Sequence, residues 1–211
     1  MKKHESKINI AVLVSGSGTN LQAIIDAQEK GILRHGEVKI VISNKKDAYA
    51  VNRAKKHSIK AETVIKEGQN SQDIFENSIK KILRENDIHL IVLAGFTNIL
   101  SQKFTSEYKN KIINVHPSLI PSFCGKGFYG IKVHEEAINY GVKVTGATVH
   151  FVSEIPDGGK IIMQKAIYIN KGDTPETLQK RVMQKAEWII LPRAIEKVCV
   201  EMLKNGGCAS N

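Results

Sequence analysis

Apolar runs and amphipathic segments alternate through the first half of the chain. The sequence predicts four strands, at 8–14, 38–42, 61–65 and 89–94. It predicts helices between them, at 20–29, 47–57 and 71–85. The run from His89 to Ala94 is apolar without alternation, as expected for a central parallel strand covered on both faces. This repeat of strand and helix predicts a doubly wound α/β sheet.

The pattern changes after the apolar strand that begins at Ile112. A helix is predicted at 129–139, and β-rich runs follow at 144–153 and 160–169. The connection Ile155-Pro-Asp-Gly-Gly159 is short and turn-forming, so the two runs are expected to pair as a hairpin.

The last element is a long helix. Thr174-Pro175-Glu176 combines an N-cap residue, a proline at the first helical position and an acid in the first turn. We expect this helix to reach about Lys204, with an interruption or kink at Pro192. The expected fold is therefore α/β, with a mostly parallel sheet, a C-terminal β-hairpin and a long C-terminal helix.

The 211 residues contain no linker, repeat or low-complexity segment. We therefore expect one domain over residues 1–211, with flexible tails at 1–7 and 205–211.

The segment Ile112-Ile-Asn-Val-His-Pro-Ser-Leu-Ile-Pro121 places polar side chains at the end of a strand. Proline pushes the residue before it into an extended conformation, so Asn114 and His116 fall on the same side of the chain. An amide and an imidazole presented together can polarise a carbonyl and move a proton. The alternative is a strand end whose histidine is hydrogen-bonded within the core.

A glycine-rich loop, Ser15-Gly-Ser-Gly-Thr-Asn-Leu21, follows the first strand and opens a helix. Free N–H groups at a helix N-terminus suit a phosphate. A dinucleotide site is disfavoured because position 21 is leucine and no acid follows Ser43-Asn44. The Gly-Lys-Ser/Thr of a Walker loop is absent from the sequence. The loop predicts a phosphomonoester site, and a merely tight turn is the alternative.

Three polar features are expected at one edge of the sheet, because the carboxyl ends of parallel strands meet there. They are the glycine-rich loop, Gly95-Phe-Thr-Asn98 and the Asn114 segment. Asp157 could orient His116 and raise its pKa, although Asp-Gly-Gly is also ordinary hairpin-turn chemistry. His150 could line the same cleft, but a structural role is favoured.

Composition limits the remaining possibilities. The formal charge is +10, but the lysines are scattered and not interleaved with aromatics, so we expect a solvated surface and no nucleic-acid partner. Three widely spaced cysteines signal neither a disulfide framework nor a zinc site. No apolar run is long enough to span a membrane and no signal-peptide apolar region follows the charged start. We expect a cytoplasmic protein with no membrane partner and no metal.

Six stretches together resemble the phosphoribosylglycinamide formyltransferases, folate-dependent enzymes of purine synthesis. The resemblance runs from about residue 8 to Pro192, and its motifs lie at 15–23, 43–45, 93–96, 114–121, 144–150 and 157–159. Asn-x-His-Pro-Ser-Leu marks the wider folate-dependent formyltransferase family. The Gly-Ser-Gly-Thr-Asn loop narrows the resemblance to the branch with a phosphorylated ribosyl substrate.

The resemblance implies a Rossmann-like formyltransferase fold, and direct transfer of a formyl group from 10-formyltetrahydrofolate to the amine of glycinamide ribonucleotide. It implies that Asn114 hydrogen-bonds the formyl oxygen. It further implies that His116 stabilises the oxyanion of a tetrahedral intermediate and moves a proton, while Asp157 orients His116 and raises its pKa.

The resemblance also implies two sets of binding residues. Those for the ribonucleotide are Ser17, Gly18, Thr19 and Asn20 at the phosphate and Glu187 at the ribose hydroxyls. Those for the folate are Thr97, Asn98, Ile99, Leu100, Asn114, Ser153, Glu154, Ile155 and Pro156. The expected enzyme is a monomer or a homodimer.

The sequence departs from the family pattern at Gln72, where some members have an arginine, at Asn98, where arginine is common, and in the loop from Cys124 to Gly130. Lys126 could replace a lost positive charge there.

Three alternatives are less favoured, the first two because the chain is too short for the additional segments of those relatives. A formyltetrahydrofolate hydrolase shares the three catalytic residues but carries an N-terminal regulatory domain. The transfer-RNA formylating relative has a long C-terminal extension. A nucleotide-binding module would need the phosphate loop alone.

Overall fold

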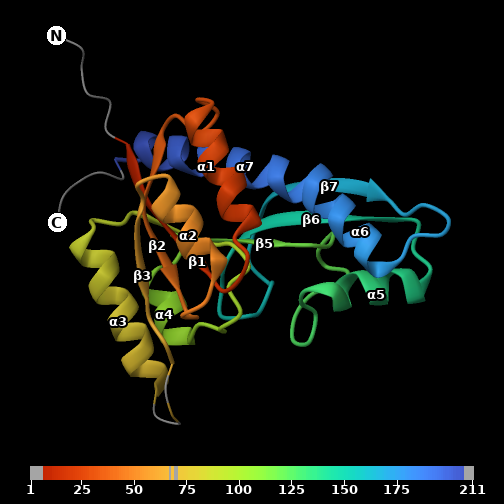
Figure 1. The fold of residues 1–211 in the computed structure, drawn as a ribbon, viewed down its shortest axis with the longest axis horizontal. Coiled ribbons are helices and arrows are strands. Elements are labelled where there is room, and N and C mark those ends of the chain that lie inside the picture. Colours follow the sequence, from red (N-terminus) through yellow and green to blue (C-terminus); the bar gives the residue numbers. More distant parts are fainter. Residues whose placement is uncertain (1–6, 67, 69–70, 207–211) are drawn as a thin grey trace.

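The computed structural model describes residues 7–66, 68 and 71–206, so most of both expected tails lies outside the described part. Seven strands form one sheet in the order β3-β2-β1-β4-β5-β6-β7 (Figure 1). The strands are β1 Ile8–Val14, β2 Gly36–Ser43, β3 Lys60–Thr63, β4 Leu90–Leu93, β5 Ile112–His116, β6 Val144–Phe151 and β7 Ile161–Tyr168. Neighbouring strands from β3 to β5 are parallel, and the β5–β6 and β6–β7 pairs are antiparallel. The predicted mostly parallel sheet and C-terminal hairpin are confirmed.

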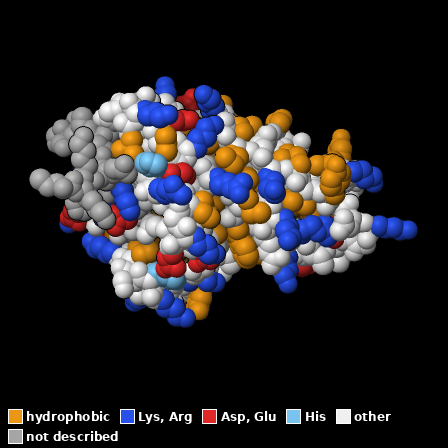
Figure 2. All heavy atoms as spheres, turned by 90° about the horizontal axis from the view of Figure 1, so that it is seen from above, with side chains coloured by type: hydrophobic (Ala, Val, Ile, Leu, Met, Phe, Trp, Pro, Cys, Tyr) orange, Lys and Arg blue, Asp and Glu red, His pale blue; other side chains and the backbone are white. Residues whose placement is uncertain are grey.

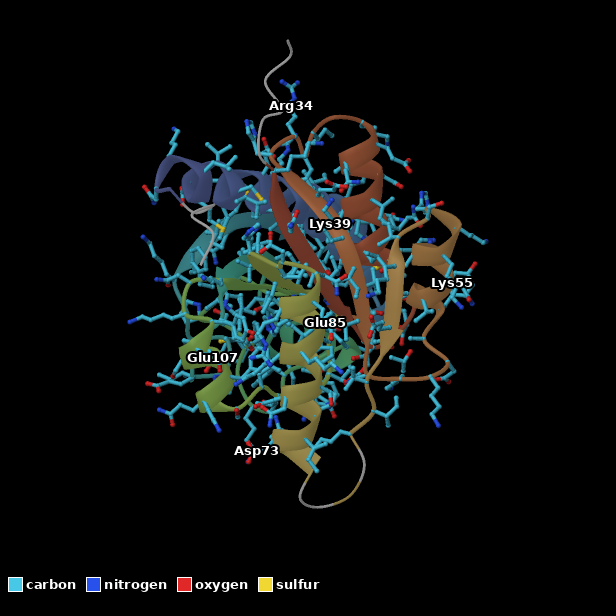
Figure 3. The ribbon with its side chains drawn as sticks, turned by 90° about the vertical axis from the view of Figure 1, so that its left-hand side faces the viewer. Arg34, Lys39, Lys55, Asp73, Glu85 and Glu107 are labelled. Carbon is cyan, nitrogen blue, oxygen red and sulfur yellow. The ribbon has the colours of Figure 1, made fainter. Side chains whose placement is uncertain are left out.

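Helices cover both faces of this sheet (Figures 1 and 3). They are α1 Thr19–Glu29, α2 Tyr49–Lys56, α3 Ser71–Glu85, α4 Gln102–Glu107, α5 Ile131–Tyr140, α6 Pro175–Val182 and α7 Trp188–Lys204. Alternate residues of β1 serve the two cores. Ile10 and Val12 pack with α1, α6 and α7, whereas Ala11 and Leu13 pack with α3 and α4. Both faces of the central strands are therefore buried, which explains why β4 shows no polar alternation.

Helix α4 is absent from the elements that the sequence predicts. It has six residues, too few to show a helical period, and its N-cap residue is Ser101, whose side chain accepts a hydrogen bond from Phe104 N. A serine N-cap was the available signal.

The interruption of the C-terminal helix lies before Pro192, which corrects the expected position. Residues Met183–Glu187 form a π-helical turn, η1, between α6 and α7, and Pro192 stands inside the unbroken α7. A proline ring clashes with the turn that precedes it, so a distortion on its N-terminal side is expected physically. Glu187 is the last residue of this π turn.

The strand register aligns the residues of the candidate site. Leu93 pairs with Leu13 on one side and with Asn114 on the other, and Asn114 pairs with His150 across the antiparallel β5–β6 ladder. This row across four strands thus places an amide beside an imidazole.

Candidate active site

Asn114 and His150 are neighbours in this row. Asn114 Nδ2 lies 3.3 Å from His150 Nε2, and His150 Nδ1 lies 2.8 Å from the Phe151 carbonyl oxygen. The carbonyl can only accept, so in the neutral ring Nδ1 carries the proton and Nε2 accepts from Asn114. His150 is buried and therefore holds the Asn114 amide in one orientation.

Asp157 lies between the two histidines. Its Oδ2 is 3.5 Å from His116 Nδ1, and its Oδ1 is 3.5 Å from His150 Nε2. The backbone N–H of Gly125 donates to Oδ2 at 2.9 Å. Asp157 follows β6 in the hairpin connection with a φ of 56°, a left-handed conformation that aspartate adopts more readily than most residues. The structure thus brings together Asn114, His116 and Asp157, and it adds His150.

The pKa of His116 corrects one expectation. Burial lowers this pKa, and it outweighs the Asp157 carboxylate and the Phe123 carbonyl, which raise it, so the net pKa lies below the ordinary value. Asp157 acts in the expected direction but does not decide the sign. Sequence reasoning missed this because it identified the partner charge but not the depth at which the imidazole lies.

Asp157 itself is held ionised. Burial raises the pKa of this carboxyl, but the protonated forms of His150 and His116 and the Gly125 N–H together outweigh it, so its pKa lies below the ordinary value. An anion therefore stands beside a largely neutral imidazole, ready to stabilise the imidazolium when His116 takes a proton.

The loop after Pro121 closes over His116. His116 Nε2 lies 2.8 Å from the carbonyl oxygen of Phe123, so Nε2 carries a proton and Nδ1 is the basic nitrogen of the neutral ring. Phe123 has a φ of 49°, an uncommon conformation for an aromatic residue. The loop thereby sets the tautomer of His116.

The glycine-rich loop begins α1 without a side-chain cap. Gly18 is the N-cap residue with a φ of 71°, and a Cβ built on it would lie 2.6 Å from the Ala50 Cβ. Only glycine fits this approach of the loop to α2. Arg53 of α2 donates from Nε to the carbonyl oxygen of Ser17 at 2.8 Å. An uncapped helix N-terminus with a guanidinium beside it favours a phosphate.

Asn20 and Glu187 connect this loop to the π turn. Asn20 Nδ2 donates to Glu187 Oε2 at 2.7 Å, and Thr19 Oγ1 lies 3.4 Å from the Met183 sulfur. Burial raises the pKa of Glu187, and the bond from Asn20 only partly offsets this. The side chains proposed for the phosphate and for the ribose hydroxyls thus lie side by side.

The segment after β4 is tied to the phosphate loop and to β2. Thr97 N donates to Ser15 Oγ at 2.8 Å, and Asn44 Nδ2 donates to Asn98 Oδ1 at 2.9 Å. Leu100 is buried, whereas Ile99 is exposed. The three polar features predicted to share one edge of the sheet therefore do so.

The 153–156 segment forms the other side of this region. Glu154 accepts from Gln102 Nε2 at 2.6 Å, which links the segment to α4. Ser153 Oγ donates to the Ile155 carbonyl at 3.1 Å, while Ile155 and Pro156 are exposed. These contacts hold the folate-binding candidates on two neighbouring segments.

Comparison with known proteins identifies the family. The formyl transferase family model matches residues 8–195. The chain belongs to this family. It is 37% identical over 191 residues to the phosphoribosylglycinamide formyltransferase of Escherichia coli, covering 89% of this chain and 85% of that protein. The structure of glycinamide ribonucleotide transformylase 1 from Symbiobacterium toebii matches with a TM-score of 0.85 and 37% identity, covering 92% of this chain and 89% of that one.

A family relative of different size is a trifunctional protein. The trifunctional purine biosynthetic protein adenosine-3 of Bos taurus is 40% identical over 201 residues, covering 95% of this chain. The chain spans about a fifth (19%) of the length of that relative.

Four further side chains contact the candidate site, and sequence reasoning did not assign them a role there. His150 was expected to be structural, and the structure instead places it against both Asn114 and Asp157. Its signal was the strand alternation that puts it opposite Asn114 once β5 and β6 are paired. Ser15 and Asn44 lie in segments that the sequence singled out, but neither was assigned a role, and Arg53 had no local signal; each contacts a segment distant in sequence.

Two further observations concern the described residues only. They contain no group of three or more His, Cys, Asp or Glu side chains that could hold a metal ion, and we assign no metal ligand. None of the helices in that part of the chain has the length and apolarity needed to cross a membrane.

Proposed function

We propose that this chain transfers the formyl group of 10-formyltetrahydrofolate to the amine of glycinamide ribonucleotide. The products are formylglycinamide ribonucleotide and tetrahydrofolate, in the de novo synthesis of the purine nucleotide IMP. The observation that carries this proposal is the cluster of Asn114, His116 and Asp157 at the sheet edge that also holds the phosphate loop. The likeness to the Escherichia coli enzyme supports the choice of substrates.

The ribonucleotide is proposed to bind through its phosphate and its ribose. Ser17, Gly18, Thr19 and Asn20 present the N-terminus of α1 to the phosphate, next to the Arg53 guanidinium. Glu187 accepts from the ribose hydroxyls, for which its carboxylate, buried beside Asn20, is suited.

The formyl group is proposed to react between Asn114 and His116. The free amine attacks the formyl carbon, and the formyl oxygen becomes an oxyanion that the Asn114 amide and His116 stabilise by hydrogen bonds. One such donor is worth about 3–4 kcal/mol of barrier in comparable sites. The carbon–nitrogen bond to the folate then breaks, and a proton passes from the amine to the folate nitrogen, with His116 and Asp157 assisting.

His116 must exchange one hydrogen bond in this step. Its Nε2–H donates to the Phe123 carbonyl in the structure, so it can donate to the oxyanion only after that bond is replaced. The hydrogen bond between Asn114 and His150 does not need to be replaced, because the second N–H of the Asn114 amide can donate to the oxyanion. In the proposed step the Asn114 amide keeps its hydrogen bond to His150, while His116 exchanges the Phe123 carbonyl for the oxyanion.

The folate is proposed to lie between the segment after β4 and the 153–156 segment. Thr97 and Asn98 are held by Ser15 and Asn44, and Glu154 is held by Gln102. Ile99 and Ile155 expose apolar side chains on these two segments, which suits a flat aromatic ring.

The test is an assay with purified protein, glycinamide ribonucleotide and 10-formyltetrahydrofolate. We expect tetrahydrofolate release that requires the ribonucleotide and matches the formylated ribonucleotide one to one. Equal release without the ribonucleotide would identify a hydrolase and reject the transferase proposal.

A second experiment separates catalysis from binding alone. His116→Asn should abolish turnover and leave ribonucleotide affinity within about twofold, since His116 is proposed to act on the formyl group. His89→Gln is the matched control. His89 precedes the amino end of β4, whereas the proposed reaction centre lies at the carboxyl ends of the parallel strands. A His116→Asn protein with full turnover would reject this role.

A further inference from the structure

A groove between α1 and the start of α7 lies apart from the proposed reaction centre. It encloses about 370 Å³, within the range of about 300–1,000 Å³ found for ligand pockets. Its α1 wall comes from one helix face, with Thr19, Gln22, Ala23, Asp26, Ala27 and Lys30. Trp188, Ile189, Pro192 and Arg193 form the opposite wall. Two residues of the lining are shared with the proposed ribonucleotide site: Thr19 belongs to the phosphate loop, and Arg53 lies beside that loop.

The groove has an apolar floor. Ala23 and Ala27 contribute from α1, and Trp188 and Pro192 from α7. Ile32, at the end away from Thr19, is 48% exposed. Figure 2 looks onto the face that α1 and α7 form and shows hydrophobic side chains among Lys and Arg side chains. A flat or cyclic apolar group would remove this surface from water.

The charged side chains around the floor favour an anion. The lining contains three cationic side chains, Lys30, Arg53 and Arg193, and one carboxylate, Asp26. Asp26 already accepts a hydrogen bond from Gln22 Nε2 at 2.8 Å. Lys30 and Arg193 form no ion pair with the described residues. Two cations over an apolar floor are therefore available to a ligand.

We propose that this groove binds a small organic anion, with its apolar ring on the floor and its anionic group at Arg193 and Lys30. A second copy of the chain fits less well, because each copy carries a formal charge of +10 and like charges repel. A phosphate or sulfate alone would leave the floor uncovered. The occupant is thus a molecule that combines a ring with a negative charge.

Trp188 makes the groove directly observable, since it is the only tryptophan in the chain. Its Nε1–H is buried and has no acceptor among the described residues, so a displacement of the ring by a ligand should change its emission. We would titrate the full chain with 4-butylbenzenesulfonate and follow Trp188 fluorescence and heat of binding. Two comparison probes are methanesulfonate, which lacks the ring, and 4-butyl-N,N,N-trimethylanilinium, which reverses the charge.

We expect saturable binding of the sulfonate and at least tenfold weaker binding of both comparison probes. Raising the salt concentration should weaken the sulfonate binding, because exposed charges are screened. Equal binding of the cationic probe would overturn the proposal, since the groove would then select only for apolar surface.

Three substitutions in the groove test whether the sulfonate binds there. Arg193→Glu and Lys30→Gln should each weaken it at least fivefold, and Ala23→Met should weaken it similarly by filling the floor. Lys55→Gln is the control for Lys30→Gln, because both lysines lie at the end of their helices. Lys55 is exposed (Figure 3), and because it lies two residues after Arg53 in α2, helix geometry puts it on a different face from Arg53.

Far-ultraviolet circular dichroism and thermal unfolding show whether each variant is folded. Folded Arg193→Glu and Lys30→Gln proteins that keep the original affinity would place the sulfonate elsewhere, for example at the phosphate loop, and overturn the proposal. Turnover with both substrates is not the readout, so this result is independent of the proposed formyl transfer.

Discussion

Asn20 donates its side-chain amide to Glu187 across 2.7 Å, although 167 positions separate the two residues in the chain. This bond joins the start of α1 to the end of the π turn. It gives the buried carboxyl one neutral donor, and no cation among the described residues pairs with it, so the charged form of Glu187 is poorly stabilised. The proposed ribose site therefore contains a group that weakens the fold.

Glu187→Gln should stabilise the protein at neutral and alkaline pH. Because the pKa of Glu187 is raised in the folded state, its neutral form favours folding below the unfolded-state pKa. This contribution is lost as pH rises through the folded-state pKa. We expect the melting temperature of Glu187→Gln relative to the original protein to increase between pH 5 and pH 8.

The same variant should bind the ribonucleotide less well, with a KM about tenfold higher and a kcat that changes little. Glu85→Gln, at the exposed end of α3 (Figure 3), is the control and should change neither quantity. A Glu187→Gln protein that loses stability relative to the original at pH 8 would contradict the assigned cost of the buried charge.

Gly18→Ala should damage the phosphate loop. The residue has a positive φ, and an added Cβ would lie 2.6 Å from the Ala50 Cβ, so α2 or the loop must shift. We expect a loss of about 1–3 kcal/mol in the free energy of unfolding and a higher KM for the ribonucleotide. Urea unfolding measures the first quantity.

Gly16→Ala is the matched control for this change, because no atom lies within 4 Å of its built Cβ and its φ is not positive. Equal destabilisation by the two alanines would show that the contact with Ala50 is not the cause.

Asp157→Asn should lower turnover and move the pH dependence of kcat. The Asp157 charge raises the pKa of His116 against the larger effect of burial, so its removal lowers that pKa further. We therefore expect the limb of the pH profile that reports His116 to shift toward lower pH. An unchanged limb would remove Asp157 from the proton transfer.

His150→Leu should reduce kcat through Asn114. The substitution leaves the Asn114 amide without its acceptor, and the freed amide can rotate away from the position proposed for the formyl oxygen. We expect kcat to fall about tenfold or more, with the ribonucleotide KM within twofold. His150→Gln should restore part of the activity, because its side-chain oxygen can accept from Asn114; no difference between the two variants would leave His150 a purely structural role.

Much of the fold could be predicted from local pattern. The β1 and β4 runs and the α3 stripe follow from hydrophobic period, and the start of α6 follows from Thr174-Pro175. Helix α4 could not be predicted in this way because it is shorter than two helical turns. The interruption of the C-terminal helix was predicted at Pro192 but lies at Met183–Glu187, since proline marks a distortion and the preceding turns decide where it falls.

The sequence by itself determined which residues could do chemistry and which edge of the sheet would hold them. Asn114 and His116 share a strand, and a parallel sheet brings strand ends together whatever the details of packing. Only the tertiary structure decided three things: that His150 pairs with Asn114, that burial outweighs Asp157 at His116, and that Glu187 meets Asn20. Each depends on strand register, on depth below the surface or on helix phase. These quantities are set by contacts between segments distant in the chain, and no local pattern encodes them.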